Sequence, residues 1–212
     1  MDSDKRVGLF GGTFDPVHFG HLRPAVEIAE LYNLESLFVM PSHRPAHRGP
    51  TGASSKQRIA MLSMAVEGAP RLVVDAREAL RDEPTYTFHT LSEIKEEQPD
   101  ATILFFLGMD SFAAFDTWQN WEGILELANL VVLNRPGATH SDFSRQLFER
   151  QLSANGSELV SGGTGVVQSC GVTQLSISAT DVRRRIAGHL SVRFLLPDAV
   201  SEYIGDNNLY RR

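Results

Sequence analysis

The chain has 212 residues, of which 42% are hydrophobic and 22% charged, and this composition is typical of one globular domain, expected to span residues 1–212. The formal net charge of −6 at pH 7 argues against broad binding of nucleic acid or of an anionic membrane, so a phosphate site would have to be local. The single cysteine, Cys170, cannot form an intrachain disulfide, and no segment approaches the roughly 20 apolar residues of a membrane helix, so we expect a cytoplasmic protein.

Short apolar runs alternate along the chain with segments whose apolar residues recur at spacings of three and four. The runs are expected strands and cover residues 7–10, 36–40, 71–75, 102–107 and 130–134. The intervening segments are expected helices and cover residues 22–32, 56–67, 87–97 and 123–128. This alternation predicts an α/β fold with a Rossmann-like, doubly wound parallel sheet, covered by helices on both faces. Ligands of such sheets bind beyond the carboxyl ends of the strands.

The segment after the first expected strand reads GGTFDPVHFGH. Gly11 and Gly12 allow a tight turn and let the backbone approach a ligand closely. The helix expected to begin near Gly20 would direct its free N–H groups into the same crevice, as in many phosphate sites. His18 and His21 would lie over that anion site, where both could donate hydrogen bonds to one phosphate.

Other interpretations of this turn remain open. Thr13 and Asp15 can satisfy amides of the turn in such a phosphate site. The alternative is that the two histidines are simply solvated or cap a helix. A zinc site needs three or four ligands, and although His43 and His47 follow, no cysteine or acidic cluster stands among the histidines. We therefore expect no metal held by the protein itself.

Two irregular segments punctuate the pattern. Proline, histidine and glycine crowd residues 41–52, which we expect to form a loop on the ligand side of the sheet. Residues 154–171 are rich in glycine and serine and predict a mobile excursion or an irregular hairpin.

The segment GMDSFAAFDTWQNW follows the fourth expected strand. Gly108 would let a ligand lie against the backbone, and Asp110 could accept hydrogen bonds from sugar hydroxyls, although it could equally cap a helix. Trp118 and Trp121 are spaced as one helical face, and indoles at this spacing more often belong to a core or an interface than to a ligand platform.

A second helix start with phosphate-binding character is expected in the segment ISATDVRRRI. Ser178 followed by Asp181 is a capping-box pattern, and Arg183 adds a permanent cation one turn into the helix. Such an end suits the outer phosphates of ATP, but a capped basic surface helix would have the same pattern.

These motifs together resemble a known family. The string GGTFDPVHFGH resembles the opening motif of the HxGH nucleotidyltransferases, and in its full form that of the nicotinate mononucleotide adenylyltransferase family. The family's later motifs resemble, in order, the segments MPSHRPAHR, EPTYTFHTL, GMDSFAAFDTWQNW, NRPG, ISATDVR and FLLPDAVSEYI. The resemblance therefore covers nearly the whole chain and implies the HxGH nucleotidyltransferase fold. Ala179 stands where the family usually has a second serine, which puts one hydroxyl contact in doubt.

The resemblance implies transfer of AMP from ATP to nicotinate mononucleotide, with Mg²⁺ bound together with ATP. The implied catalytic residues are His18, His21 and Arg183. The implied ATP-binding residues are these three together with Gly11, Gly12, Thr13, Phe14, Gly108, Asp110, Ser178 and Thr180. The implied mononucleotide-binding residues are Ser42, His47, Arg48, Thr87, Asp110, Trp118 and Arg135. Within this set Trp118 would stack on the pyridine ring, and His47, Arg48 and Arg135 would clamp the mononucleotide phosphate.

Two kinds of alternative function remain. A related transferase could use nicotinamide mononucleotide, phosphopantetheine or a cytidylyl acceptor, and the segments around Thr87 and Trp118 argue against the last two. The chain could also be a non-catalytic nucleotide-binding regulator or an RNA-binding relative, against which the intact histidine pair and the acidic balance argue respectively. We expect no nucleic-acid or membrane partner, and association of identical chains is left open.

Overall fold

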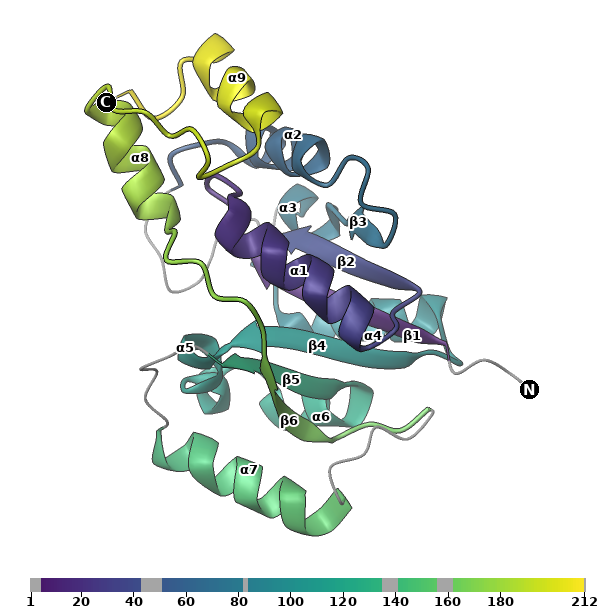
Figure 1. The fold of residues 1–212 in the computed structure, drawn as a ribbon. Coiled ribbons are helices and arrows are strands. Elements are labelled where there is room, and N and C mark those ends of the chain that lie inside the picture. The colour runs from purple at the N-terminus through teal and green to yellow at the C-terminus, as the bar shows by residue number, and fades with distance from the viewer. Residues whose placement is uncertain (1–4, 43–50, 82–83, 135–140, 156–161, 212) are drawn as a thin grey trace.

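The computed structural model describes residues 5–42, 51–81, 84–134, 141–155 and 162–211. A six-stranded sheet runs through the molecule with helices packed around it (Figure 1). The strands are β1 (Arg6–Gly12), β2 (Ser36–Pro41), β3 (Leu72–Val74), β4 (Thr102–Gly108), β5 (Asn129–Asn134) and β6 (Val167–Gly171). The helices are α1 (Phe19–Leu31), α2 (Ser55–Ala65), α3 (Arg77–Leu80), α4 (Thr87–Glu97), α5 (Met109–Phe112), the 3₁₀ helix η1 (Phe115–Thr117), α6 (Trp121–Leu127), α7 (Asp142–Asn155), α8 (Ala179–Ala187) and α9 (Asp198–Asp206).

The sheet is parallel throughout and has the strand order β3-β2-β1-β4-β5-β6. The chain steps outward from β1 through β2 to β3, returns to the middle at β4, and then steps outward in the other direction to β6. This confirms the predicted fold class. The direction reverses between β1 and β4, and ligands of such sheets bind beyond the carboxyl ends of the strands at this point.

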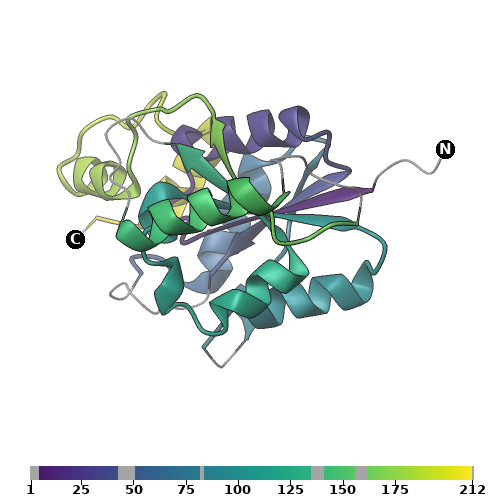
Figure 2. The ribbon, with the colours of Figure 1, turned by 90° about the horizontal axis from the view of Figure 1, so that it is seen from below.

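Apolar side chains on the two faces of the sheet form two separate cores. Along β4 every residue before Gly108 is buried, and alternate side chains serve opposite faces. Leu104 and Phe106 pack into the core beneath α1, α2 and α9, whereas Ile103 and Phe105 pack into the core beneath α4, α6 and α7. Figure 2 shows these helices on both sides of the strands. The two cores pack the central strands from both faces. Because the strands are parallel, their carboxyl ends lie at the same edge of the sheet.

The five expected strands and the four expected helices are present, with ends that differ by a few residues. The expected helix over 87–97 has the bounds of α4 itself. The short helices α3, α5 and η1 and the longer α7 had no counterpart among the predicted elements. The helix expected to start after Ser178 is α8.

The interpretation of residues 154–171 as a mobile excursion or hairpin was wrong for its described end. Val167–Gly171 form β6, which extends the sheet by pairing in parallel with β5. The preceding backbone is held by buried polar side chains: the Asn129 amide donates to the Gly163 carbonyl at 2.8 Å and accepts from the Val166 N–H at 3.0 Å. The Thr102 hydroxyl accepts from the Gly162 N–H at 2.7 Å. The segment has no local apolar run that would predict a strand. Its structure depends on these long-range bonds and on the pairing with β5.

None of the helices in the described ranges combines the length and the apolar character needed for a membrane span.

Candidate active site

The turn between β1 and α1 lies at the point where the strand order reverses. β1 ends at Gly12, and the ring of Phe14 lies so close that a Cβ added to Gly12 would be 2.8 Å from it. Phe14 has φ of 48° and a side chain that is almost completely buried, so its ring anchors the turn in the core. Only the backbone of Phe14 could therefore contact a nucleotide. Gly11, where an added Cβ would meet no atom of the described residues within 4 Å, leaves the backbone of the turn uncovered there.

His18 and His21 form a stacked pair of imidazoles at the start of α1. Their ring centroids are 3.8 Å apart and their planes differ by 24°. His18 is buried and His21 is half-buried, with the edge of Phe14 against its ring at 5.0 Å. In the described part of the chain His18 stands at the N-cap position without a side-chain capping hydrogen bond. Its side chain is thus not used for capping, which removes one of the alternative interpretations.

Gly20 lies between the His18 ring and the residues that precede α8, where a side chain would not fit without a shift. A Cβ at this position would lie 3.0 Å from the His18 ring and 3.1 Å from the carbonyl oxygen of Ile177, next to the start of α8. The starts of α1 and α8, which are far apart in the sequence, therefore lie against each other. The expectation of free N–H groups at the α1 start needs correction, because the Phe19 N–H donates to the Leu195 carbonyl at 3.0 Å and the His21 N–H donates to the His18 carbonyl at 2.8 Å.

α8 brings the expected phosphate-binding residues to the same place. Ser178 caps the helix by accepting from the Asp181 N–H at 3.1 Å, as predicted. The reciprocal half of the capping box is replaced: the Asp181 carboxylate accepts from Arg184 and Arg185, and these bonds hold the pKa of Asp181 below its usual range. Asp181 therefore stabilises the helix flank instead of the helix start.

Arg183 reaches across from α8 to the first turn. Its guanidinium donates to the backbone carbonyl of Asp15 at 2.6 Å and to the Thr180 hydroxyl at 3.3 Å. About a third of its side chain, 34%, remains exposed. A permanent cation is thereby fixed beside the turn that leads to the histidine pair, with part of its surface exposed.

The sequence analysis missed two residues that hold this arrangement together, Arg58 and Tyr210. Arg58 is fully buried and donates to the Thr13 carbonyl at 2.7 Å, and the Tyr210 hydroxyl donates to the Asp15 carboxylate at 2.7 Å. Arg58 shares a helix face with the buried Met61 and Leu62, so its position on an apolar stripe was a usable signal. Nothing local marks Tyr210.

The side chain of Asp15 was expected to satisfy amides of its own turn. Within the described residues it accepts instead from the Gly52 N–H at 2.7 Å and the Ala53 N–H at 3.0 Å. The turn is therefore tied to the segment that precedes α2.

Ser42, a residue of the predicted mononucleotide set, is hydrogen-bonded to the turn. It follows β2, and its N–H and its hydroxyl both donate to the Gly12 carbonyl, at 3.0 and 3.4 Å. Gly108 ends β4, the strand beside β1, and is the N-cap of α5. Asp110 follows in the first turn of that helix with an exposed side chain, so it is not the N-cap residue.

The two tryptophans are not on one helical face, because Asn120 takes a left-handed conformation between them. Trp118 follows η1 and is half-buried, with ring centroids 5.5 Å from Phe115 and 6.0 Å from Phe105. Trp121 begins α6 and packs on Phe115 and Phe143. Thr87 is the first residue of α4. His47, Arg48 and Arg135 lie outside the described residues.

Comparison with known proteins places this geometry in a family. A family described as cytidylyltransferase-like matches residues 9–185. A protein of Pseudomonas paraeruginosa named "Probable nicotinate-nucleotide adenylyltransferase" is 44% identical over 210 residues, covering 98% of each chain. A protein of Cellvibrio japonicus with the same name is 43% identical, covering 97% of this chain and 98% of the relative. The chain belongs to the nicotinate-nucleotide adenylyltransferase family.

The fold of this nicotinate-nucleotide adenylyltransferase family member also matches solved structures. The Plasmodium falciparum nicotinic acid mononucleotide adenylyltransferase complexed with APC superposes with a TM-score of 0.73 at 18% identity, covering 97% of each chain. The same enzyme complexed with NaAD gives the same TM-score of 0.73. At this identity the likeness supports the fold.

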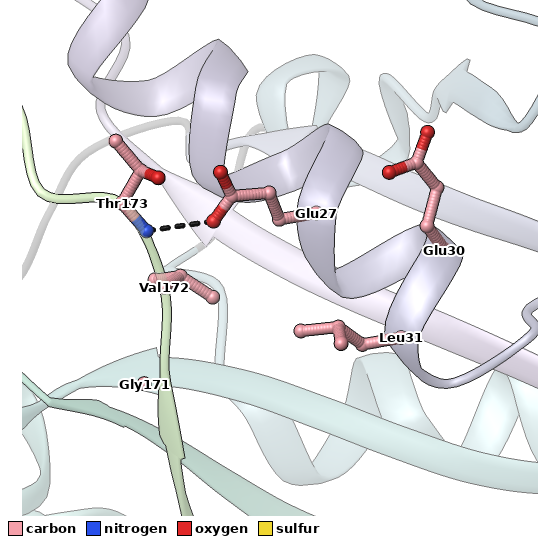
Figure 3. A pocket seen from close by; sticks show the side chains of 6 residues that line it. All are labelled: Glu27, Glu30, Leu31, Gly171, Val172 and Thr173. Atoms are coloured by element: carbon pink, nitrogen blue, oxygen red, sulfur yellow. Dashed lines mark hydrogen bonds between the residues drawn. The ribbon is translucent and has the colours of Figure 1, made fainter.

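A surface pocket of about 590 Å³ lies elsewhere in this family member, between α1 and the segment that follows β6 (Figure 3). Its lining residues are Glu27, Glu30, Leu31, Gly171, Val172 and Thr173. Glu27 accepts from the Thr173 N–H at 2.6 Å, and hydrogen bonds from Thr173 lower the pKa of Glu27 to about 2. None of the predicted site residues lines this pocket, so we assign it no part in the chemistry.

Proposed function

We infer that the chain is a nucleotidyltransferase that transfers the adenylyl group of ATP to nicotinate mononucleotide, giving deamido-NAD and pyrophosphate. The observation that carries this proposal is the stacked His18–His21 pair at the β1–α1 turn, with Arg183 held beside the turn. Relatives at 43–44% identity over nearly their full length carry the name of this activity, which supports the choice of acceptor.

The reaction needs no nucleophile from the protein. A phosphate oxygen of the mononucleotide attacks the α-phosphorus of ATP in line, and the bond from that phosphorus to the bridging oxygen of pyrophosphate breaks. The attacking oxygen is already anionic, so catalysis consists of positioning the two substrates and stabilising charge on the transferring and leaving phosphates.

The ATP side of the site is assigned to the two helix starts. His18 and His21 donate to the transferring phosphate, and Arg183 with the helix start at Ser178 and Thr180 attends the leaving pyrophosphate. The turn residues Gly11, Gly12, Thr13 and Phe14 contribute backbone contacts to the nucleotide. Gly108 and Asp110 lie at the end of the neighbouring strand and are assigned to the ribose.

The mononucleotide side is assigned to the elements flanking that turn. Ser42, bonded to Gly12, contacts the acceptor, and Asp110 contributes to its sugar. Trp118 presents a half-buried ring for stacking on the pyridine, and the first turn of α4 at Thr87 offers main-chain amides to the pyridine carboxylate. The proposed phosphate clamp of His47, Arg48 and Arg135 completes the set.

Mg²⁺ is proposed to enter with ATP. Among the described residues no group of three or more histidine, cysteine, aspartate or glutamate side chains could hold a metal ion. The side chains gathered at the turn are imidazole, guanidinium and hydroxyl groups, and these are not the carboxylate ligands that Mg²⁺ prefers. Mg²⁺ would therefore take its oxygen ligands from the triphosphate and from water. When bound there, Mg²⁺ would neutralise charge on the phosphate oxygens.

Pyrophosphate release with ATP and Mg²⁺ tests the proposal directly. The acceptors are nicotinate mononucleotide, nicotinamide mononucleotide and phosphopantetheine, each in a separate assay, with a control that lacks acceptor. We expect release with nicotinate mononucleotide and a dinucleotide product of the mass of deamido-NAD. Release with another acceptor alone would overturn the substrate assignment, and no release with any acceptor would favour a non-catalytic regulator.

A further inference from the structure

Asp15 is a buried carboxylate at the centre of the phosphate-binding turn. It is only 5% exposed, and three donors from outside the turn converge on its carboxylate: the N–H groups of Gly52 and Ala53 and the hydroxyl of Tyr210. These bonds engage both oxygens of the buried carboxylate. We therefore assign Asp15 a positioning role and no contact with substrate.

Two arginines that are far apart in the sequence bind the backbone of the same turn. Arg58 of α2 donates to the Thr13 carbonyl, and Arg183 of α8 donates to the Asp15 carbonyl. Burial lowers the pKa of the Arg58 guanidinium, and the nearby Asp15 and Tyr210 act in the opposite direction. The turn is thus fixed at two carbonyls by arginines, and Arg183 also lies 3.8 Å from the Asp15 carboxylate as an ion pair.

Tyr210 is held in place by the segment that it contacts. A Cβ added to Gly52 would lie 2.8 Å from the Tyr210 ring, so the ring packs directly on the backbone of Gly52. Burial and the neighbouring Asp15 raise the pKa of the Tyr210 hydroxyl, which keeps it protonated and able to donate. Tyr210 therefore both donates to the turn and packs on the backbone of Gly52, just before α2.

We propose that Asp15 and Tyr210 form a positioning pair, which fixes the β1–α1 turn against the backbone of Gly52 and Ala53. The proposal rests on the function proposed above, because the turn leads directly to His18 and its Gly12 carbonyl accepts from Ser42 of the proposed acceptor site. By holding the turn, the pair keeps these residues in place for both substrates and so supports the rate of transfer.

Tyr210→Phe tests the pair, because it removes one hydroxyl and keeps the ring that packs on Gly52. We expect kcat for adenylyl transfer, per folded molecule, to fall about 10-fold, the scale of losing a hydrogen bond to a charged acceptor, with a smaller change in KM for ATP. The matched control is Tyr203→Phe in α9, whose hydroxyl makes no recorded hydrogen bond within the described residues. The control should stay within about 2-fold of the unchanged protein.

A purely structural role of Tyr210 would give a different result. In that case Tyr210→Phe would lower the melting temperature and leave kcat and KM of the folded protein unchanged, which would overturn the proposal. Asp15→Asn is the second variant, since an amide would turn an NH₂ donor toward one or more of the donors that Asp15 now accepts from. It should lower kcat more than Tyr210→Phe does, and an Asp15→Asn variant as active as the unchanged protein would also overturn the proposal.

Amide hydrogen exchange separates this proposal from the proposed function. If the unchanged protein transfers no adenylyl group, exchange is compared between it and Tyr210→Phe, together with affinity for α,β-methylene-ATP. Faster exchange at Gly52, Ala53 and the turn, with weaker binding of the analogue, would support the positioning pair although the proposed reaction had failed. Unchanged exchange and unchanged affinity would overturn the pair whatever the reaction is.

Discussion

His18 and His21 are the residues on which the proposed chemistry depends. Because their rings are stacked with centroids 3.8 Å apart, both can face one phosphate group and donate to different oxygens of it. The burial of His18 keeps water from competing for that position. Local sequence predicted the pair and its place after β1, but the stacking depends on Phe14 and Gly20 and required the structure.

His18→Ala or His21→Ala should each lower the turnover number by about 10²- to 10³-fold, the loss that follows removal of one preorganised donor. Steady-state kinetics with ATP and nicotinate mononucleotide measures this. His189→Asn is the control, because His189 is exposed and has φ of 55°, a conformation that asparagine tolerates. Turnover that persists in both alanine variants, with folding intact, would remove the proposed roles.

Gly20→Ala should lower the activity even though alanine favours a helix more than glycine does. Alanine ordinarily stabilises a helix relative to glycine by about 1 kcal/mol, but here its Cβ would press on the His18 ring and on the Ile177 carbonyl. We expect turnover to fall about 10-fold because the ring must shift. The control is Gly205→Ala in α9, where a Cβ meets no atom within 4 Å among the described residues. A Gly20→Ala variant with full activity would show that the close approach has no catalytic consequence.

At the scale of elements, the connection from β6 to α8 is what delivers the second phosphate-binding helix to the first. Glu27 on α1 anchors this connection by accepting from the Thr173 N–H at 2.6 Å (Figure 3). Glu27 also accepts from the Arg23 guanidinium at 2.6 Å. These bonds require the ionised carboxylate, so the pKa of Glu27 is lowered from 4.5 to about 2. A group with a lowered folded-state pKa stabilises the protein above its unfolded pKa.

Glu27→Gln should therefore lower the free energy of unfolding at pH 7 by about 1 kcal/mol, since the amide keeps an acceptor and solvent screens the lost charge. The difference between variant and unchanged protein should shrink as pH falls from 4.5 toward about 2, where the unfolded state protonates first. Urea denaturation at several pH values measures it. A difference that is independent of pH would show that the charge of Glu27 contributes nothing to this anchor.

Sequence patterns predicted the strands that carry apolar runs and failed at β6. The segment VQSCG has no such run and follows a glycine-rich stretch, so local preference gave no strand signal. Pairing with β5 and the buried bonds of Asn129 and Thr102 decide its structure, and these contacts span at least 34 positions of sequence. α7 was missed because its sequence is largely polar.

Asn129→Ala should lower the free energy of unfolding by about 2–3 kcal/mol, because it leaves the Gly163 carbonyl and the Val166 N–H without their buried partner. Thermal and urea denaturation measure the loss. Asn207→Ala is the control, since the exposed Asn207 amide donates only to the nearby Tyr203 carbonyl in the described structure, and it should cost less than about 1 kcal/mol. Equal losses in both variants would contradict the role given to Asn129.

At the scale of the whole molecule, the fold brings together segments from both ends of the sequence. The turn at 11–21 meets α8 through Ile177 and Arg183, and it meets the chain end through Tyr210. The predicted ATP-binding motifs could be identified from the sequence because each has its own glycine, histidine or capping pattern. Arg58 and Tyr210 could not be assigned in the same way, since their importance comes from contacts with Thr13 and Asp15 that no local pattern encodes.

A crystal structure with α,β-methylene-ATP and nicotinate mononucleotide tests the central claim most directly. We predict that the triphosphate lies between the His18–His21 pair and the start of α8, with the pyridine ring on Trp118. A triphosphate bound elsewhere, for example beside Glu27 and Thr173, with the histidine pair left without contact to it, would contradict the account.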